Sequence, residues 1–437
     1  MMSQARTLHF IDKLFIGLLL VVFGGIVLHA PFMVSLGTVL PEAELGIKAW
    51  KEVLLAVATG LFLVIYMREK RPEMFKSPLS LLIGAYFALH LLMVPVFFTG
   101  VESTVAGLLI DLRFLVFFVL VYGALRLYPQ TKTLFLRTFF AGAAVVAGFA
   151  VLQVTVLPDD VLSHIGYGAS TISPYLTIDQ NTDYVRINST LRGPNPLGAY
   201  AAIVIAISLA YWLKARRSMG SWRQVGLGVL VVASTVALWA SYSRSAAVAA
   251  IVAVGLVIVV SLGKRYGKYV AAAMVAVALL GTTGLIAFRD SSFVSHVVLH
   301  ANPQDESATN SNEGHAESLA DGAERMINQP FGAGVGSTGS ASLQTDTPLI
   351  IENQYLMVAH EVGWLGALTF IAIFGLLLRE LWQRRGYWLA LGVGASGIGM
   401  AIIGVLLPVW VDDTVSIVWW GLAAIALAVG SAQNRRT

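Results

Sequence analysis

The sequence predicts an all-α membrane protein with about 12 transmembrane helices and two large loops on the non-cytoplasmic side. The first reason is composition: 57% of the 437 residues are hydrophobic and only 12% are charged. A soluble domain would carry roughly a quarter charged residues. The other reasons are a series of apolar stretches long enough to cross a bilayer and the gathering of polar motifs in two long loops. Cysteine is absent, which excludes disulfides, thiol nucleophiles and thiolate metal sites.

The predicted spans are apolar stretches that match a hydrocarbon core about 30 Å thick. The first continues through Val34 without a clear cleavage site, so we interpret it as an uncleaved span rather than a signal peptide. The chain shows no inserted soluble domain and no internal repeat, so residues 1–437 are predicted to form a single transmembrane domain. The stretches fall near residues 13–33, 48–67, 79–99, 105–126, 134–157, 195–214, 225–241, 244–262, 269–288, 361–378, 386–408 and 413–432.

The distribution of Lys and Arg orients the chain, because cytoplasmic loops carry an excess of them. With the N-terminus in the cytoplasm, 21 of the 29 basic residues fall in inner segments, which predicts that both termini are cytoplasmic. Residues 158–194 then form the first outer loop, and residues 289–361 form the second outer loop, with short helices. The basic residues left on the outer side each require a reason: Lys48, Lys51, Arg113, Arg186, Arg192, Arg244, Arg289 and Arg325.

The first motif is RINSTLRGPNPLG, residues 186–198, between the first outer loop and a span. Pro194 and Pro196 fix a rigid entry to a helix. The free N–H groups and positive end of that helix favour an anion, and Arg186 and Arg192 add full charges nearby. The alternative is a capped helix entry with two solvated arginines.

The second motif is SYSRSA, residues 241–246, a very short outer turn between two spans. Arg244 therefore lies near the membrane boundary with almost no loop to carry it into solvent. Ionisable groups at this depth are costly and usually functional. Snorkelling of the side chain to the lipid headgroups is the alternative.

The second outer loop carries a glycine run, Gly332, Gly334 and Gly336, that could let backbone approach a phosphate or a sugar. The run lacks the strand–turn–helix setting of a dinucleotide loop and lacks a Walker lysine. It is therefore weak evidence of a ligand site when taken alone.

Polar residues also lie in and after this loop. Helical spacing places Glu352, Leu356 and His360 along one face, with Glu352 and His360 about 12 Å apart, so these two would have separate roles. His360 could instead be packed or face headgroups. His315 could be an ordinary solvated loop histidine.

Four acidic or basic residues elsewhere are weaker candidates. Asp111 and Arg113 lie in one span, but their spacing puts them on different faces, so each is expected to pair with another helix or line a cavity. Asp412 and Asp413 lie in an outer turn, where solvation would explain them. No clustered His, Asp and Glu spacing predicts a metal site.

Several of these segments resemble one family, the O-antigen ligase and O-antigen polymerase superfamily of membrane glycosyltransferases. Residues 186–195 are similar to the family's Arg-x-x-Gly-Thr-aromatic-x-x-Pro-Asn segment, with Ser189 at the glycine and Leu191 at the aromatic position. Ser243-Arg244 is similar to a Ser-Arg turn that the family carries two spans later.

The second outer loop continues the resemblance. Residues 330–334, PFGAG, are similar to a Pro-hydrophobic-Gly-x-Gly segment, and residues 361–366, EVGWLG, to a Glu-x-Gly-hydrophobic-hydrophobic-Gly segment. Between them, ENQYL stands where family ligases have His-Asn-x-x-Leu, so Glu352 replaces a histidine thought to activate the acceptor hydroxyl. This replacement occurs in polymerase-like relatives and favours a polysaccharide polymerase over a lipid A-core ligase. The resemblance covers residues 180–370, and the first five spans add topology only.

The resemblance implies a chemistry and assigns roles to residues. The donor would be a glycan on a polyprenyl (undecaprenyl) diphosphate, and fixed cations would stabilise the departing diphosphate. Arg186 and Arg244 would be catalytic and bind the diphosphate, with Arg192 as a third diphosphate ligand. Glu352 would be the catalytic base for the acceptor hydroxyl. Residues that would bind the acceptor or shape the cavity are His315, Asn353, His360 and Glu361.

The expected function is that of a surface polysaccharide (O-antigen-type) polymerase in the bacterial inner membrane, with an active site that faces outward. The expected partners are the lipid-linked donor, a glycan or glycolipid acceptor and membrane lipids, without nucleic acid, metal or cofactor. One alternative is an O-antigen ligase that transfers glycan to a lipid or a protein. A different class is a lipid-linked glycan flippase or transporter, although transporters usually show paired halves and broken helices.

Overall fold

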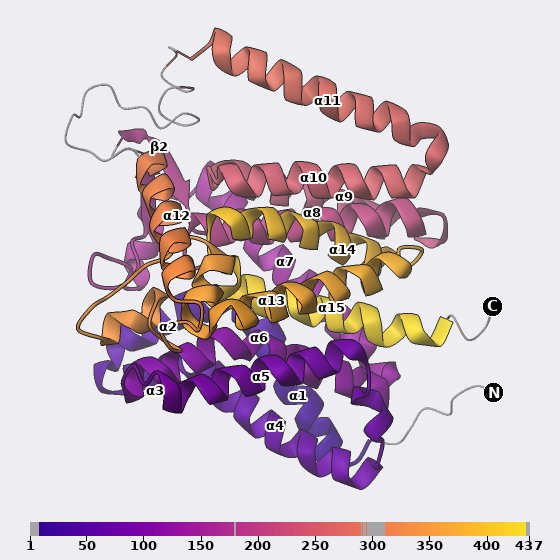
Figure 1. Ribbon diagram of the computed structural model, residues 1–437. Helices are drawn as coiled ribbons and strands as arrows, with labels where there is room; N and C mark the ends of the chain where they lie inside the picture. Colours follow the sequence, from indigo (N-terminus) through magenta and orange to yellow (C-terminus); the bar gives the residue numbers. More distant parts are fainter. Residues whose placement is uncertain (1–7, 179–180, 290, 292–293, 295–310, 434–437) are drawn as a thin grey trace.

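The computed structural model describes residues 8–178, 181–289, 291, 294 and 311–433, without some side chains of α11, those of residues 311–316 and those of residues 429–433. Most of its long helices run side by side along one direction (Figure 1), so the predicted all-α fold is confirmed. The helices are α1 (Phe10–Gly25), α2 (His29–Val39), α3 (Glu44–Lys48), α4 (Trp50–Glu69), α5 (Pro78–Val96), α6 (Val101–Leu127), α7 (Lys132–Thr155), α8 (Pro194–Ala215), α9 (Ser221–Ala240), α10 (Arg244–Leu262), α11 (Lys264–Ala287), α12 (Ser311–Asn328), α13 (Gln354–Gln383), α14 (Trp388–Leu406) and α15 (Asp413–Gln433).

Within the described residues, ten helical segments are long and apolar enough to cross a membrane. By the length and composition of its helices, the chain is therefore a multi-pass membrane protein. The predicted spans near 269–288 and 413–432 correspond to α11 and α15, which are not among the ten. α15 contains a shorter apolar helix, Asp413–Ala428. The number of twelve spans stays a prediction.

The bundle has two different ends. α1 begins and α15 ends at one of them, which we call the terminal end, whereas a β-hairpin and α12 lie at the other, the hairpin end (Figure 1). Arg68, near the end of α4, donates a hydrogen bond of 2.6 Å to Asp12 near the start of α1. The same guanidinium donates to the Tyr128 hydroxyl just after α6. α4 and α6 therefore both end beside the start of α1.

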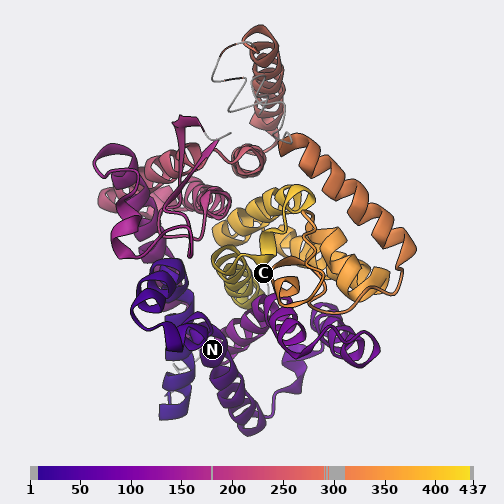
Figure 2. The same ribbon diagram turned by 90° about the vertical axis from the view of Figure 1, so that its left-hand side faces the viewer.

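The centre of the bundle is formed by α15 and its neighbours (Figure 2). Trp419 of α15 is completely buried, and a Cβ atom on Gly421 would lie 2.7 Å from the Phe117 ring of α6. Lipid tails are as apolar as side chains, so close packing at small residues is a main source of helix association in membranes. α14 and α10 approach in the same way, since a Cβ on Gly399 would lie 2.9 Å from the Ala249 carbonyl oxygen. α14 therefore lies directly against α10.

The only strands in the described residues form a two-stranded antiparallel hairpin, β1 (Tyr175–Ile178) and β2 (Asn181–Ile187). Leu176 of β1 pairs with Arg186 of β2. β2 leads into α8, which begins at Pro194 as the proline pattern predicted. The hairpin therefore carries Arg186 to the hairpin end of the bundle.

α13 is broken at Gly363, whose φ of 72° and ψ of −177° are not helical. The segment after α12 supplies the backbone partners that the break removes. Trp364 N donates to Pro330 O at 3.0 Å, and Ala333 N donates to His360 O at 2.6 Å. An unsatisfied backbone group in lipid costs several kcal/mol, so a broken helix is stable there only where protein covers it. The break divides α13 into a short first arm and a long second arm.

The glycine run packs closely against other backbone. Gly334 and Gly336 have φ values of 104° and 82°, in the region that favours glycine. A Cβ on Gly334 would lie 2.3 Å from Phe97 O, and one on Gly336 would lie 2.1 Å from Ser103 O. Tight packing against the connection between α5 and α6 therefore accounts for these glycines.

We predict that Gly336→Ala destabilises the fold by about 3 kcal/mol, because it adds both backbone strain and a steric clash. Gly339→Ala is the matched control: its φ is also positive, at 68°, but a Cβ there meets nothing within 4 Å. The control should lose only about 1 kcal/mol. Equilibrium unfolding of the purified variants in mixed micelles measures both values. Equal losses in the two variants would refute the packing explanation.

Candidate functional site

Two of the predicted arginines lie near each other at the hairpin end. Arg186 Nε donates to Ser241 O at 3.0 Å, and its Nη2 donates to the side-chain oxygen of Asn195 at 2.7 Å. Burial and then the charge of nearby Arg244 lower the pKa of Arg186 to about 10, so the guanidinium stays charged at neutral pH. Both hydrogen-bond acceptors are neutral, so no carboxylate of the described residues compensates Arg186. Two cations are held together where they repel each other.

The first turns of α8 and α10 meet beside these arginines. A Cβ on Gly198 of α8 would lie 2.8 Å from Ala246 Cβ and 2.9 Å from Ser243 Cβ of the α10 entry. No side chain caps either helix, although Ser243 occupies the N-cap position of α10. Two positive helix ends with free N–H groups therefore lie together, which favours negative charge at this place.

The backbone around the arginines is held in an uncommon conformation. Ser189 and Tyr242 have φ values of 51° and 48°, which non-glycine residues rarely adopt. Ser189 N donates to Gln153 Oε1 at 2.8 Å, and Ser189 Oγ donates to Val146 O at 2.7 Å. The resembling family has glycine at this position, which agrees with the left-handed backbone. Such strain persists only where the surroundings fix it, so both arginine-bearing segments are firmly positioned.

Glu352 precedes α13 rather than lying on it. The helix begins at Gln354, and Asn353 is its N-cap, with a side-chain oxygen that accepts from two N–H groups of the first turn. The Asn353 amide nitrogen donates to Val405 O at 2.7 Å. The predicted alignment of Glu352 with His360 on one helical face is therefore wrong, because the helix starts two residues after Glu352. Both the oxygen and the nitrogen of the Asn353 amide therefore form hydrogen bonds within the protein.

The end of α14 lies between Glu352 and the arginine pair. Gly399 of α14 contacts Ala249 of α10. By the helical rise, Val405, which lies beside Asn353, is about 9 Å from that contact toward the hairpin end. Arg244, at the start of α10, is about 8 Å from the same contact in the same direction. Glu352 and Arg244 therefore lie at a similar depth.

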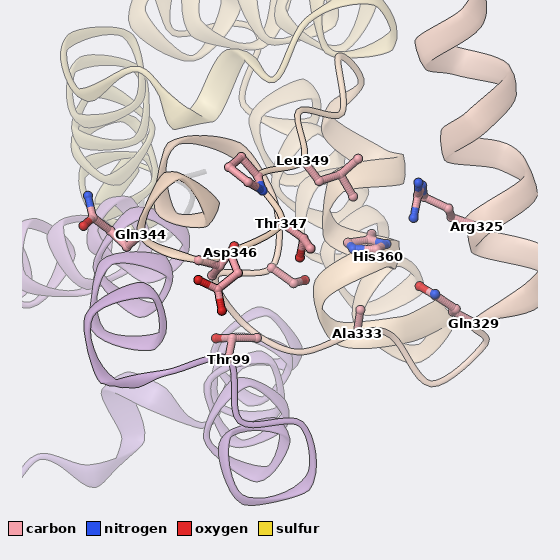
Figure 3. A pocket seen from close by; sticks show the side chains of 12 residues that line it. Thr99, Arg325, Gln329, Ala333, Gln344, Asp346, Thr347, Leu349 and His360 are labelled. Carbon is pink, nitrogen blue, oxygen red and sulfur yellow. The ribbon is translucent and has the colours of Figure 1, made fainter.

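A polar cavity of 720 Å³ lies beside α12 and the first arm of α13 (Figure 3). His360 lies between Arg325 on one side and Asp346 on the other. We call it the His360 cavity. Its lining residues are Thr99, Arg325, Gln329, Ala333, Ser337, Gln344, Thr345, Asp346, Thr347, Pro348, Leu349 and His360.

Arg192 lines a different cavity, of 630 Å³, next to a network of ion pairs. Asp413 is at the centre of the network: Lys51 Nζ lies 2.9 Å from its carboxylate, and His29 Nε2 lies 3.2 Å from it. Arg113 also pairs with Asp413. The structure thus gives Lys51 and Arg113 carboxylate partners and separates Arg192 from the cavity that contains His360.

The interpretation of Asp412 and Asp413 as solvated turn residues is wrong. Asp413 pairs with buried cations, and Asp412 Oδ1 accepts a hydrogen bond of 2.9 Å from Val415 N. Burial raises the pKa of Asp412, against the hydrogen bond from Val415 N that lowers it; the negative charge of Asp413 raises it further, and Arg192 and Arg113 oppose this. Composition of the turn alone gave no sign of this burial.

Removal of the central carboxylate should destabilise the bundle. We predict that Asp413→Ala lowers the unfolding free energy by about 3–5 kcal/mol, because the single carboxylate of Glu52 is then left to compensate both buried cations, Lys51 and Arg113. Lys48→Ala is the control, since Lys48 and Glu44 form a half-exposed pair worth less than about 1 kcal/mol. Unfolding in mixed micelles distinguishes the two. A loss below about 1 kcal/mol for Asp413→Ala would contradict the importance of the network.

Glu361 belongs to a buried chain of polar groups rather than to the wall of the His360 cavity. Its carboxyl lies within hydrogen-bonding distance of Asp111, and Asp111 Oδ2 lies 3.6 Å from His90 Nε2. Thr338 N donates to Glu361 Oε1 at 3.4 Å. Asp111 and Arg113 point to different partners, as their spacing predicted. This chain of polar groups connects α5, α6 and α13.

Three further polar residues of this region are His315, Gln329 and Asp346. His315 is in α12, but its side chain lies outside the described part of the structure. The sequence analysis missed Gln329 and Asp346, because a single amide and a single loop carboxylate show no pattern. Over the ranges that the structure covers, no three His, Asp or Glu side chains converge as a metal site would require.

Residues 229–371 match the model of a protein family described as O-antigen ligase. This region contains Arg244, Glu352 and His360, and it confirms the resemblance to the O-antigen ligase and polymerase superfamily. No curated protein matches the chain.

Proposed function

We propose that this chain, with its O-antigen ligase domain, is a membrane glycosyltransferase that uses a glycan on a polyprenyl (undecaprenyl) diphosphate. The acceptor is a sugar hydroxyl, so the product is a longer surface polysaccharide of the O-antigen type. The observation that carries the proposal is the pairing of Arg186 with Arg244 beside two helix N-termini. Two guanidinium groups and two positive helix ends at one place favour the binding of a polyanion.

The reaction displaces the lipid diphosphate from the anomeric carbon. The acceptor oxygen forms a bond to that carbon, and the carbon–oxygen bond to the diphosphate breaks, with both electrons leaving on the diphosphate oxygen. Arg186 and Arg244 stabilise the charge that develops there, in the way that preorganised donors lower such barriers. The acceptor proton passes to Glu352, which lies at a similar depth beyond the end of α14.

The hairpin end is proposed to face outward from the bacterial inner membrane. The basic residues Arg68, Arg126 and Lys214 occupy the last turns of α4, α6 and α8, and those of α4 and α6 lie at the terminal end. An excess of such residues marks the cytoplasmic side. The Glu352 and arginine groups would then meet a donor that has already been moved across the membrane.

A transporter is the competing class, and the broken helix α13 is the observation in its favour. Residues 330–334 cover this break, however, and supply its hydrogen-bond partners. In transporters, broken helices typically line the substrate site. The enzyme proposal therefore accounts for the break better.

The test is transfer by the purified protein in detergent without any ion gradient, with lipid-diphosphate-linked repeat units as the substrate. The expected result is longer glycan together with released polyprenyl diphosphate. Failure to consume the donor in the absence of a gradient would overturn the proposal. Mass analysis of glycans from a deletion strain then separates the acceptors: loss of long chains indicates a polymerase, and full-length unattached chains indicate a ligase.

A further inference from the structure

The His360 cavity contains three buried polar atoms that have no hydrogen-bond partner in the described part of the chain. They are His360 Nδ1, Arg325 Nε and Gln329 Oε1. His360 is only 3% exposed, and all three side chains line the same 720 Å³ space. Buried polar groups in proteins nearly always have partners. Three such atoms around one cavity therefore mark a place where water or a polar ligand completes their hydrogen bonds.

The lining of this cavity selects the chemistry of the ligand. The Arg325 guanidinium donates, the Asp346 carboxylate accepts, and the amide of Gln329 offers both kinds of group. The hydroxyl of Thr347 can donate and accept, whereas that of Thr345 donates to Ser342 O and can only accept from a ligand. The lining has no Phe, Tyr or Trp ring that would favour a flat ligand. A hydroxyl-rich sugar matches this mixture, and the volume falls in the range of about 300–1,000 Å³ found for small-ligand sites.

The position of the cavity follows from the packing of α12 along the first arm of α13. Ser318 Oγ accepts a hydrogen bond of 3.0 Å from Glu352 N, and Trp364 Nε1 donates to Met326 O at 2.6 Å. Between these two contacts, α12 and the first arm of α13 therefore lie side by side and run in the same direction. Arg325 lies seven residues after Ser318, a rise of about 10 Å. The cavity is thus near Glu352 but too far for its contents to react there.

We propose that the His360 cavity is a subsite that binds a sugar of the acceptor glycan away from the reacting hydroxyl. The assignment rests on the proposed function, in which Glu352 receives the proton of the acceptor. A chain whose end sits at Glu352 extends along α12 and places an inner sugar against His360, Arg325 and Gln329. This contact selects acceptors by the identity of that inner sugar.

The experiment compares Gln329→Ala with Asn328→Ala, because the two amides are neighbours at the end of α12 and Asn328 lines only an adjoining hollow of 280 Å³, not the His360 cavity. The probe is the free repeat-unit oligosaccharide, released by mild acid from the cell's own surface polysaccharide. In transfer assays, the KM for this acceptor should rise about tenfold in Gln329→Ala, the factor expected from one lost hydrogen bond. The kcat and the KM for the donor should stay unchanged, and Asn328→Ala should match the wild type.

A binding measurement separates this proposal from the proposed function. Calorimetric titration of the same oligosaccharide into Arg244→Ala protein needs no turnover, and the addition of Gln329→Ala should weaken binding about tenfold. Unchanged binding and unchanged acceptor KM in both Gln329→Ala and Arg325→Gln would overturn the subsite while leaving the enzyme assignment intact. A rise confined to the donor KM would overturn it as well. Absence of transfer by the wild type, with binding that still depends on Gln329, would overturn the enzyme assignment alone.

Discussion

Replacement of Arg186 by alanine is expected to abolish glycan transfer while the helical bundle stays folded. The side chain holds no carboxylate partner among the described residues, so its removal leaves no buried anion uncompensated. It does remove the guanidinium that, in the proposed reaction, stabilises the departing diphosphate. Loss of one preorganised donor typically lowers kcat by about 10²–10³-fold, and loss of a full charge should reach at least that range. The rate of polyprenyl diphosphate release by purified protein measures the effect.

Two matched variants show whether geometry or charge alone matters. Arg186→Lys keeps the charge but loses the planar fork that donates to Asn195 and Ser241, so it should remain strongly impaired. Arg192→Ala removes an exposed arginine that lines the cavity beside the ion pairs of Asp413, and this variant should retain nearly full activity. Wild-type activity in Arg186→Ala would refute the diphosphate site. An equal loss of activity in Arg192→Ala would show that Arg192 also belongs to the diphosphate site, as the sequence suggested.

The eight outer basic residues illustrate what the sequence could predict. The positive-inside rule identified them as exceptional, and the structure divides them by their partners. Lys51 and Arg113 neutralise Asp413, and Lys48 pairs with Glu44. Arg186 differs from them, since among the described residues it bonds only neutral groups, and it lies near a second cation, Arg244. Sequence alone could count these cations but could not show which of them a carboxylate neutralises.

The parts that sequence could not predict depend on contacts between distant segments. The break in α13 at Gly363 is stable because residues near Pro330 supply its partners, which no local pattern reveals. The His360 cavity likewise requires α12 to lie along the first arm of α13. Helical periodicity misplaced Glu352 because Asn353 caps the helix after it. Spans follow from composition, whereas caps and breaks follow from tertiary hydrogen bonds.

Replacement of Glu352 by glutamine is expected to lower kcat about 10²–10⁴-fold, the usual contribution of a general base. The Glu352 backbone N–H bonds Ser318 whichever side chain is present, so the local fold should survive. The KM for the donor should change little, because the arginine pair lies on the other side of α14. Glu317→Gln is the control, as an exposed carboxylate one residue before Ser318. Full activity of Glu352→Gln would contradict the role of base.

Glu352→His makes the sharper test, because family ligases carry histidine where this chain has glutamate. If the residue accepts a proton, imidazole should recover part of the activity that glutamine lost, and only in its neutral form. The ordinary pKa of histidine is about 6.5, so this recovery should be present above that pH and vanish as the pH falls through it. Glu352→Gln should show no such step. A recovery that is independent of pH would mean that residue 352 positions the acceptor through hydrogen bonding, and that the proton leaves by another route.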